Sequence, residues 1–194
     1  MNKIKTILLD LDGVLANCQD ALLKILKLEN DPVAYRQTDL GSYMGLTKDE
    51  FWDKVETACK PDSLFAKLPA FKSANNLIKL CKMYSDNVVI CSVVGPHTQG
   101  FSDKANWIRE HLEDKEIPIM LLSNRHKELL ANESTLLIDD FMKNCISFRN
   151  AGGMTILYPA SYNKNYEHMQ KPLSFVKQEL DKIVGNEPTE QTKE

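Results

Sequence analysis

Two aspartates that lie one residue apart, close to the start of the chain, are the residues best placed to do chemistry. Asp10 and Asp12 follow an apolar run in the order Asp-Leu-Asp-Gly. If the strand continues over both, their side chains point the same way and can reach one reacting centre. One carboxylate can attack phosphorus and form an aspartyl-phosphate, while the other moves the proton of the leaving alcohol and later of water. Asp-x-Asp-Gly is also typical of calcium loops and ordinary turns, but the calcium loop of an EF-hand follows a helix, and this one follows a strand-like run.

Two polar residues further along could bind the phosphate. Ser92 ends a second β-branched apolar run, Asn87–Ser92, and a hydroxyl at the end of a strand can donate to a phosphate oxygen. The ammonium of Lys127 could neutralise charge on the nucleophile and on the bound phosphate. Considered singly, Ser92 could equally satisfy a strand end, and Lys127 could be a solvated lysine.

A pair of adjacent acids ends a third apolar run. Asp139 and Asp140 follow Ser134–Ile138. Two neighbouring carboxylates repel each other unless a cation lies between them and their surroundings. With Asp10 they predict a Mg²⁺ site built from carboxylate oxygens, although the pair alone could be a helix cap. Three of the four groups follow apolar runs: the first aspartate pair, Ser92 and the second aspartate pair. Together with Lys127 and in this order along the chain, they favour a phosphoryl-transfer site.

These groups resemble the four signatures of the haloacid-dehalogenase superfamily of phosphatases. The matching segments are Asp10-Leu-Asp12-Gly13-Val14, Val89-Ile-Cys-Ser92, Lys127 and Ile138-Asp139-Asp140. Within that superfamily the chain is similar to the 5′(3′)-deoxyribonucleotidase family. Segments that carry this closer likeness include Asp10-Leu-Asp-Gly-Val-Leu-Ala16, Leu68-Pro69 before a helix, and the closing Tyr162-Asn163. The resemblance covers most of residues 1–165.

The resemblance implies a catalytic role for four side chains. Asp10 would be the nucleophile and Asp12 the general acid and base. Ser92 and Lys127 would hold the phosphate. The implied enzyme is a phosphomonoesterase that works through an aspartyl-phosphate intermediate.

The resemblance also implies a Mg²⁺ cofactor. Its protein ligands would be Asp10, the main-chain carbonyl of Asp12, and one of the pair Asp139 and Asp140. Of these two, Asp140 is preferred.

Three positions depart from the deoxyribonucleotidase pattern. Ser92 is followed by Val93-Val94-Gly95-Pro96, where related chains have a second hydroxyl and a proline. Phe141 stands where an arginine follows the paired acids, and Cys18 stands where an aromatic residue would stack on the base. These departures leave the phosphatase chemistry intact and bear on the preferred nucleotide.

Strand-like and helix-like segments alternate along the chain, which predicts an α/β fold with a Rossmann-like, mostly parallel sheet. The predicted strands are Thr6–Leu11, Asn87–Val93, Ile119–Leu122, Leu136–Ile138 and Met154–Tyr158. The predicted helices include Ser73–Tyr84 and Asp103–Leu112. Ligands of such sheets bind outside the carboxyl ends of the strands, where the candidate residues gather.

A small helical cap is predicted between the first and second signatures. About eighty residues separate them, far more than one crossover helix needs. We therefore predict a core of residues 1–16 and 70–184, a cap of residues 17–69 inserted after the first strand, and a mobile tail of residues 185–194. Thr47 and Glu50 form a capping box that predicts the start of a cap helix. Such a cap excludes water and selects the substrate.

Aromatic side chains of the cap are candidates for contact with a nucleobase. Tyr43 and Trp52 could stack on a base or belong to the packing of the cap itself. Phe51 and Phe65 are expected in the core of the cap. Lys104, which opens a helix near the second signature, is expected to be a solvated lysine rather than a phosphate ligand.

Composition agrees with a soluble enzyme. The chain has 194 residues, of which 43% are hydrophobic and 26% charged, and a formal net charge of −3 without a basic stripe, which argues against duplex nucleic acid. Five scattered cysteines without a Cys-x-x-Cys pair suit reduced thiols. We see neither a signal peptide nor an apolar run of membrane length, so we expect a cytoplasmic protein. We also expect a monomer or a homodimer.

Three functions remain open from the sequence. The first is a Mg²⁺-dependent phosphatase for nucleoside monophosphates. The second applies the same chemistry to another small phosphate, such as a sugar phosphate. The third is a non-enzymatic protein that keeps the fold to bind a ligand, which the full set of catalytic residues disfavours.

Overall fold

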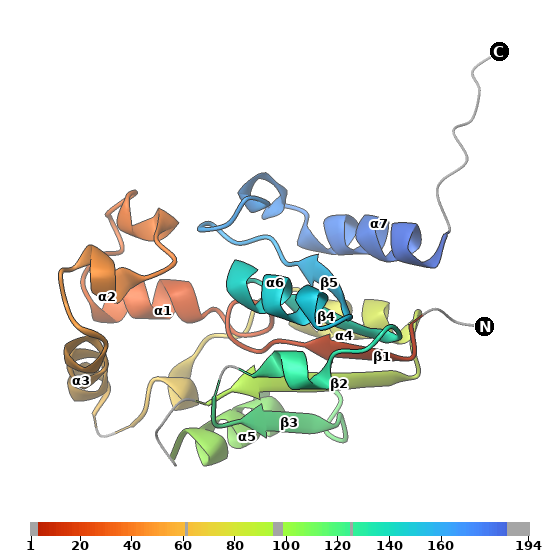
Figure 1. The fold of residues 1–194 in the computed structure, drawn as a ribbon. Coiled ribbons are helices and arrows are strands. Elements are labelled where there is room, and N and C mark those ends of the chain that lie inside the picture. The colour runs from red at the N-terminus through yellow and green to blue at the C-terminus, as the bar shows by residue number, and fades with distance from the viewer. Residues whose placement is uncertain (1–3, 61, 95–98, 125, 186–194) are drawn as a thin grey trace.

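The structure, a computed structural model, describes residues 4–60, 62–94, 99–124 and 126–185. Its centre is a five-stranded, all-parallel sheet in the order β3-β2-β1-β4-β5 (Figure 1). The strands are β1 (Thr6–Leu9), β2 (Asn87–Val93), β3 (Ile119–Leu122), β4 (Thr135–Asp139) and β5 (Met154–Leu157). The predicted α/β fold with a mostly parallel sheet is therefore confirmed.

The register of the sheet sets the proposed nucleophile beside the paired acids. Leu9 lies opposite Ile90 of β2 and Ile138 of β4. The amide of Asp10 donates to the carbonyl of Ile138 at 3.0 Å, so Asp10 stands level with Asp139. All strands run in parallel, and the residues that follow β1, β2 and β4 therefore meet at one edge of the sheet.

Helices cover both faces of the sheet (Figure 1). The helices of the core are α4 (Ala74–Lys82), α5 (Gln99–His111), α6 (Met142–Asn150) and α7 (Pro172–Val184), with the short 3₁₀ turns η3 (Lys127–Leu130) and η4 (Tyr166–His168). Successive residues of β1 point to opposite faces. Ile7 shares a hydrophobic cluster with Leu77 of α4 and Val176 of α7, while Leu8 shares another with Phe148 of α6.

The segment predicted as a cap forms a group of short helices after β1. Its elements are α1 (Cys18–Ile25), η1 (Ala34–Arg36), α2 (Leu40–Tyr43), α3 (Lys48–Cys59) and η2 (Phe65–Lys67). The capping box of Thr47 and Glu50 is present at the start of α3. Two linkers join this segment to the core and pair with each other, since Asn17 donates to the carbonyl of Pro69 at 2.8 Å and Phe71 to that of Leu15 at 2.9 Å. The paired linkers coincide with the ends of the predicted cap.

Several element boundaries differ from the prediction. β1 ends at Leu9 rather than Leu11, because the amides of Leu15 and Ala16 donate to the carbonyl of Leu11 and fold the chain into a tight loop. The strand therefore does not continue over both aspartates, and Asp10 and Asp12 lie in the loop that follows it. α5 begins at Gln99 rather than Asp103.

The described part of the chain ends just after α7. α7 ends at Val184 and is capped by Gly185, which adopts a positive φ of 82°. The rest of the predicted tail, residues 186–194, lies outside the described residues. Within the described residues, no helix combines the length and the apolar character needed to cross a bilayer.

Candidate active site

The proposed nucleophile, Asp10, lies at the first turn after β1. It is 7% exposed, and its Oδ1 accepts hydrogen bonds from the amide of Leu11 and from Lys127 Nζ, both at 2.8 Å. The loop then turns at Gly13, whose φ of +80° favours glycine. A Cβ at Gly13 would collide with the carboxyl group of Asp140. This glycine is therefore required both for the turn and for the close approach of Asp140.

A buried lysine joins the nucleophile to the first of the paired acids. Lys127 is 2% exposed, and its Nζ lies 2.8 Å from Asp10 Oδ1 and 2.7 Å from Asp139 Oδ2. Burial alone lowers the pKa of the Lys127 ammonium, but the two carboxylates outweigh burial and raise that pKa above its ordinary value. Lys127 therefore stays charged and neutralises part of the negative charge at the site.

Asp139 and Asp140 have different surroundings. The carboxylate of Asp139 accepts three N–H donors: Lys127, the side chain of Asn144 at 2.9 Å, and the amide of Phe141 at 2.8 Å. The carboxylate of Asp140 accepts the hydroxyl of Tyr162. Asp140 thus has more lone pairs left for another ligand than Asp139 has.

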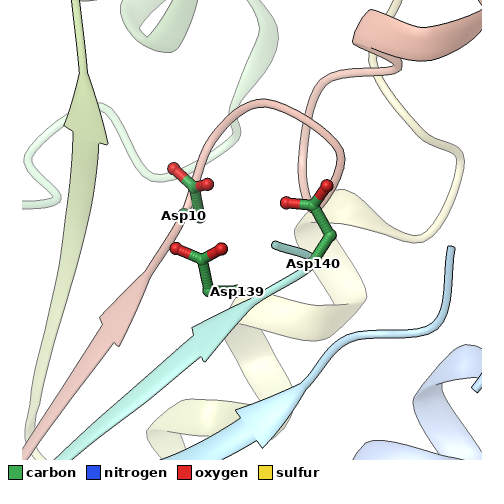
Figure 2. Close-up of side chains that lie close together, drawn as sticks. All are labelled: Asp10, Asp139 and Asp140. Atoms are coloured by element: carbon green, nitrogen blue, oxygen red, sulfur yellow. The ribbon is translucent and has the colours of Figure 1, made fainter. Parts of the chain in front are cut away.

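The three carboxyl groups of Asp10, Asp139 and Asp140 converge beyond the ends of β1 and β4, as Figure 2 shows. One oxygen of each lies within 4.8 Å of the others, and all three residues are buried. Burial first, and then the neighbouring carboxylates, raise the pKa of both Asp139 and Asp140. Lys127 supplies one positive charge against three carboxylates. The excess of negative charge and the all-oxygen donor set fit a divalent cation such as Mg²⁺.

Asp12 and Ser92 meet at a second buried lysine. Lys104 Nζ donates to Asp12 Oδ2, to Ser92 Oγ at 3.0 Å and to the carbonyl of Val93 at 2.8 Å. Its side chain is 0% exposed, so the expectation of a solvated Lys104 was wrong. The error followed from the early start of α5, which places Lys104 in the second turn of the helix against the end of β2.

The proposed acid, Asp12, is the more accessible of the two loop aspartates. Its side chain is 26% exposed, although its Oδ1 is buried and has no hydrogen-bond partner among the described residues. Burial raises the pKa of the Asp12 carboxyl, and the charge of Lys104 opposes this effect. A raised pKa favours a carboxyl group that can carry a proton.

Two aromatic residues of the cap are linked to this site by contacts that begin at Lys104. The ring of Phe65 lies 4.3 Å from Lys104 Nζ, and Trp52 packs on Phe65 with a centroid distance of 6.5 Å. Phe65 therefore contacts the site, whereas Phe51 is buried in the cap as expected. Tyr43 is exposed and its hydroxyl donates to Asp31 at 2.7 Å within the cap. Of the two predicted base-stacking residues, Trp52 is linked to the site by a ring contact and Tyr43 is bonded elsewhere.

The positions that depart from the deoxyribonucleotidase pattern also lie near the carboxylates. The thiol of Cys18 has a raised pKa because of burial and then the charge of Asp12, which places it next to the cluster. The amide of Phe141 caps Asp139. Gly95 and Pro96, which follow the second signature, lie outside the described residues.

The structure brings together six of the residues predicted from the sequence. They are Asp10, Asp12, Ser92, Lys127, Asp139 and Asp140. Sequence reasoning missed the contacts of Lys104, Asn144 and Tyr162. The only available signal was the closing Tyr162-Asn163 motif, to which no role was given. Asn163 also holds this corner, because its side chain donates to the main-chain oxygen of Asp140 at 2.9 Å.

Comparison with known proteins agrees with this geometry. A family model described as "5′ nucleotidase, deoxy (Pyrimidine), cytosolic type C protein" matches residues 2–184. A haloacid dehalogenase-like hydrolase from Streptococcus pneumoniae has a TM-score of 0.58 at 17% identity, over 91% of this chain and 98% of that chain. A haloacid dehalogenase-like hydrolase from Xanthomonas campestris has a TM-score of 0.58 at 12% identity, over 96% of this chain and 100% of that chain. The comparison with curated proteins found no match.

The two kinds of similarity carry different conclusions. At these identities the solved structures are similar in fold alone, which is the fold of haloacid dehalogenase-like hydrolases. The family match spans nearly the whole chain and includes all the residues of the site described above. The protein therefore has the fold of haloacid dehalogenase-like hydrolases and is a phosphatase that belongs to the 5′ nucleotidase, deoxy (pyrimidine), cytosolic type C family.

Proposed function

We propose that this chain is a Mg²⁺-dependent nucleotidase that removes phosphate from nucleoside monophosphates through an aspartyl-phosphate on Asp10. The observation that carries the proposal is the pairing of two differently held aspartates at one strand end. Asp10 is fixed by Lys127 and the amide of Leu11, whereas Asp12 is held by Lys104 and has a raised pKa. The two N–H donors orient Asp10 as a nucleophile, and the raised pKa suits Asp12 to act as an acid.

The hydrogen bonds suggest which oxygen of Asp10 attacks. Oδ1 already accepts two donors, so Oδ2 is the oxygen available to form a bond to phosphorus. As the phosphorus–oxygen bond to the leaving alcohol breaks, Asp12 gives its proton to that oxygen. Asp12 then takes a proton from water, which attacks the aspartyl-phosphate, releases inorganic phosphate and restores Asp10. The hydroxyl of Ser92 and the ammonium of Lys127 would stabilise the charge on the phosphoryl oxygens.

We propose that Asp10, the main-chain carbonyl of Asp12 and the carboxylate of Asp140 hold the Mg²⁺. Asp139 would add negative charge next to the ion without binding it directly, because its carboxylate oxygens already accept three N–H donors. When bound, the ion would offset the negative charge of the carboxylates and of the phosphate.

A nucleoside monophosphate is the proposed substrate, and the family name and the aromatic residues near Lys104 support it. On the cap side of the site, Phe65 lies against Lys104 and Trp52 packs on Phe65. Cys18 and Phe141 replace two residues expected to recognise the nucleotide, so another small phosphate, such as a sugar phosphate, is the second candidate. All five cysteines are free, which together with the family name supports a reducing, cytoplasmic location.

A phosphate-release screen tests the function directly. Purified protein is assayed with nucleoside monophosphates and sugar phosphates, with Mg²⁺ or with EDTA. Asp10→Asn should remove nearly all turnover, and Asp12→Asn should reduce it by about 10²- to 10⁴-fold, the usual value of general acid–base catalysis. Asp86→Asn, at an exposed aspartate, is the matched control and should keep full activity. Wild-type turnover in Asp10→Asn would contradict the assignment of the nucleophile, and a preference for sugar phosphates would contradict the nucleotide.

Alanine substitutions in the cap test the substrate separately from the chemistry. If Trp52 stacks on the base, Trp52→Ala should cost about 1 to 3 kcal/mol of recognition. This corresponds to a loss of about 5- to 150-fold in kcat/KM for a nucleoside monophosphate. Hydrolysis of a small phosphate without a base should scarcely change. Tyr43→Ala gives the comparison, because Tyr43 was predicted alongside Trp52 but is bonded to Asp31. Equal losses on both substrates with a lowered melting temperature would show that Trp52 only supports the cap.

A further inference from the structure

We propose that Lys104 is a positioning residue that orients the acid Asp12 and the phosphate-binding hydroxyl of Ser92 at the same time. The inference rests on the proposed function. It assigns to Lys104 a part in the reaction that is separate from that of Lys127. Lys127 contacts Asp10 and Asp139, whereas Lys104 contacts Asp12 and Ser92.

The contacts of Lys104 use its full hydrogen-bonding capacity. A lysine ammonium has three N–H donors. Lys104 Nζ donates to three different acceptors, Asp12 Oδ2, Ser92 Oγ and the carbonyl of Val93. Its side chain is fully buried. A buried ammonium with three acceptors in three directions is held in one place, and it holds its partners there in turn.

The contact with Ser92 determines the direction in which the hydroxyl donates. Ser92 Oγ accepts an N–H from Lys104 at 3.0 Å, and Ser92 itself is fully buried. A serine hydroxyl has one proton of its own to donate. An ammonium cannot accept that proton, so it points away from Lys104 and remains available for a phosphate oxygen.

The contact with Asp12 distinguishes its two oxygens. Oδ2 is held by Lys104, whereas Oδ1 is buried without a hydrogen-bond partner among the described residues. Through Oδ2, Lys104 thereby fixes the orientation of the carboxyl group that serves as the acid.

The position of Lys104 is fixed by the helix that carries it. Two other residues of α5 bind the end of the cap, residues 63–68. Ser63 donates to Asp103 at 2.5 Å, and the indole of Trp107 donates to the carbonyl of Leu68 at 2.7 Å. Phe65 of the same segment covers the ammonium of Lys104. The burial of Lys104 therefore depends on the contact between α5 and the cap.

The test compares two leaving groups, because a positioned acid matters most for a poor one. Alcohol release from a nucleoside monophosphate needs a proton from Asp12, whereas nitrophenolate leaves p-nitrophenyl phosphate without one. Lys104→Met should reduce kcat/KM by about 10²-fold or more for the nucleoside monophosphate and by less than about 10-fold for p-nitrophenyl phosphate. Lys79→Met is the control. Lys79 lies on α4, is exposed and pairs with Glu113, and its loss should change neither value.

A double-mutant cycle guards against a variant that fails to fold. Lys104→Met leaves Asp12 as an unpaired, partly buried carboxylate, whereas Lys104→Met with Asp12→Asn leaves no unpaired charge. If Lys104 acts through Asp12, adding Lys104→Met to Asp12→Asn should lower kcat/KM for the nucleoside monophosphate by less than about 10-fold. Melting temperatures of all four proteins accompany the assay.

Two results would overturn the inference. Equal losses of kcat/KM on both substrates would show that Lys104 does not orient the acid. A full additional loss in the Asp12→Asn background would show the same. Both results require an active wild-type enzyme. A wild-type protein that hydrolysed neither substrate would instead refute the proposed function.

Discussion

Individual hydrogen bonds hold Asp140, the proposed metal ligand, in place. Asp140 accepts the hydroxyl of Tyr162, its main-chain oxygen accepts the side chain of Asn163, and Gly13 leaves room for its carboxyl group. These neighbours orient the carboxylate without being ligands themselves. Partners of this kind are typically worth 10- to 100-fold in metal affinity.

The Tyr162 hydroxyl can be tested by deletion. Tyr162→Phe removes the bond to Asp140 and keeps the ring, so the Mg²⁺ concentration for half-maximal activity should rise by about 10-fold or more. Turnover at saturating Mg²⁺ should change much less, because Asp10 and Asp12 are untouched. A Mg²⁺ titration of activity measures both values, with Tyr166→Phe as the control at an exposed tyrosine. An unchanged Mg²⁺ dependence would show that Tyr162 does not support the metal site.

The charge of Asp140 should oppose folding when no metal is bound. Burial, and then the charges of Asp139 and Asp10, raise the pKa of Asp140 above its ordinary value. A carboxyl with a raised folded pKa favours folding fully below its unfolded pKa, and this contribution is lost as the pH rises through the folded pKa. Raising the pH above the unfolded pKa therefore destabilises the metal-free protein.

Asp140→Asn tests this effect of charge. In EDTA the variant should have a higher melting temperature than the wild type at about pH 8, and the difference should shrink toward about pH 4, near the ordinary pKa of aspartate. The variant should also lose activity. Calorimetry across this pH range measures the difference. A variant that is no more stable at pH 8, or whose advantage grows on acidification, would refute the role of charge.

At the scale of elements, α5 connects the cap to the reacting groups. Asp103 and Trp107 of this helix bind the last residues of the cap, and Lys104 binds the site. On the other side of the cap, Ser161 donates to the carbonyl of Tyr35 at 2.6 Å. The cap is thus tied to the core at two places, one of which shares a helix with the active site.

A substitution at Trp107 tests how much the contact of α5 with the cap contributes to stability. Its indole N–H is buried and donates to the carbonyl of Leu68. Trp107→Phe keeps an aromatic ring but leaves that carbonyl without its donor. This should lower the free energy of unfolding by about 1 to 3 kcal/mol, the cost of an unsatisfied buried polar group. Urea unfolding of the two proteins measures the change. Equal stability would mean that another donor, such as water, replaces the indole.

At the scale of the whole molecule, metal binding and stability should be linked. A ligand that binds only the folded state stabilises it by about 2.7 kcal/mol at 100 times its Kd. For a chain of this size, Mg²⁺ at that concentration should raise the melting temperature by about 5 to 11 °C. Ca²⁺ should also raise it but should not support turnover, because its larger and looser coordination shell suits the reacting geometry less well. Full activity after thorough chelation would contradict the metal role of Asp10 and Asp140.

The sequence by itself determined the fold class and the residues that end the strands. Apolar runs of strand length are local patterns, and parallel strands bring their carboxyl ends to one edge. Asp10, Ser92 and Asp139 could therefore be placed together from order alone. The capping box at Thr47 and Glu50 is equally local, and it is present as predicted.

Only the tertiary structure decided the partners of the buried charges. Whether Lys104 is solvated depends on where α5 begins and on the cap residue Phe65 that covers it, which lies 39 positions away in the chain. Tyr162 likewise meets Asp140 through a loop far from it in sequence. A lysine or a tyrosine has the same local pattern whether it is buried or exposed. Its role follows from long-range packing, which no periodicity in the sequence records.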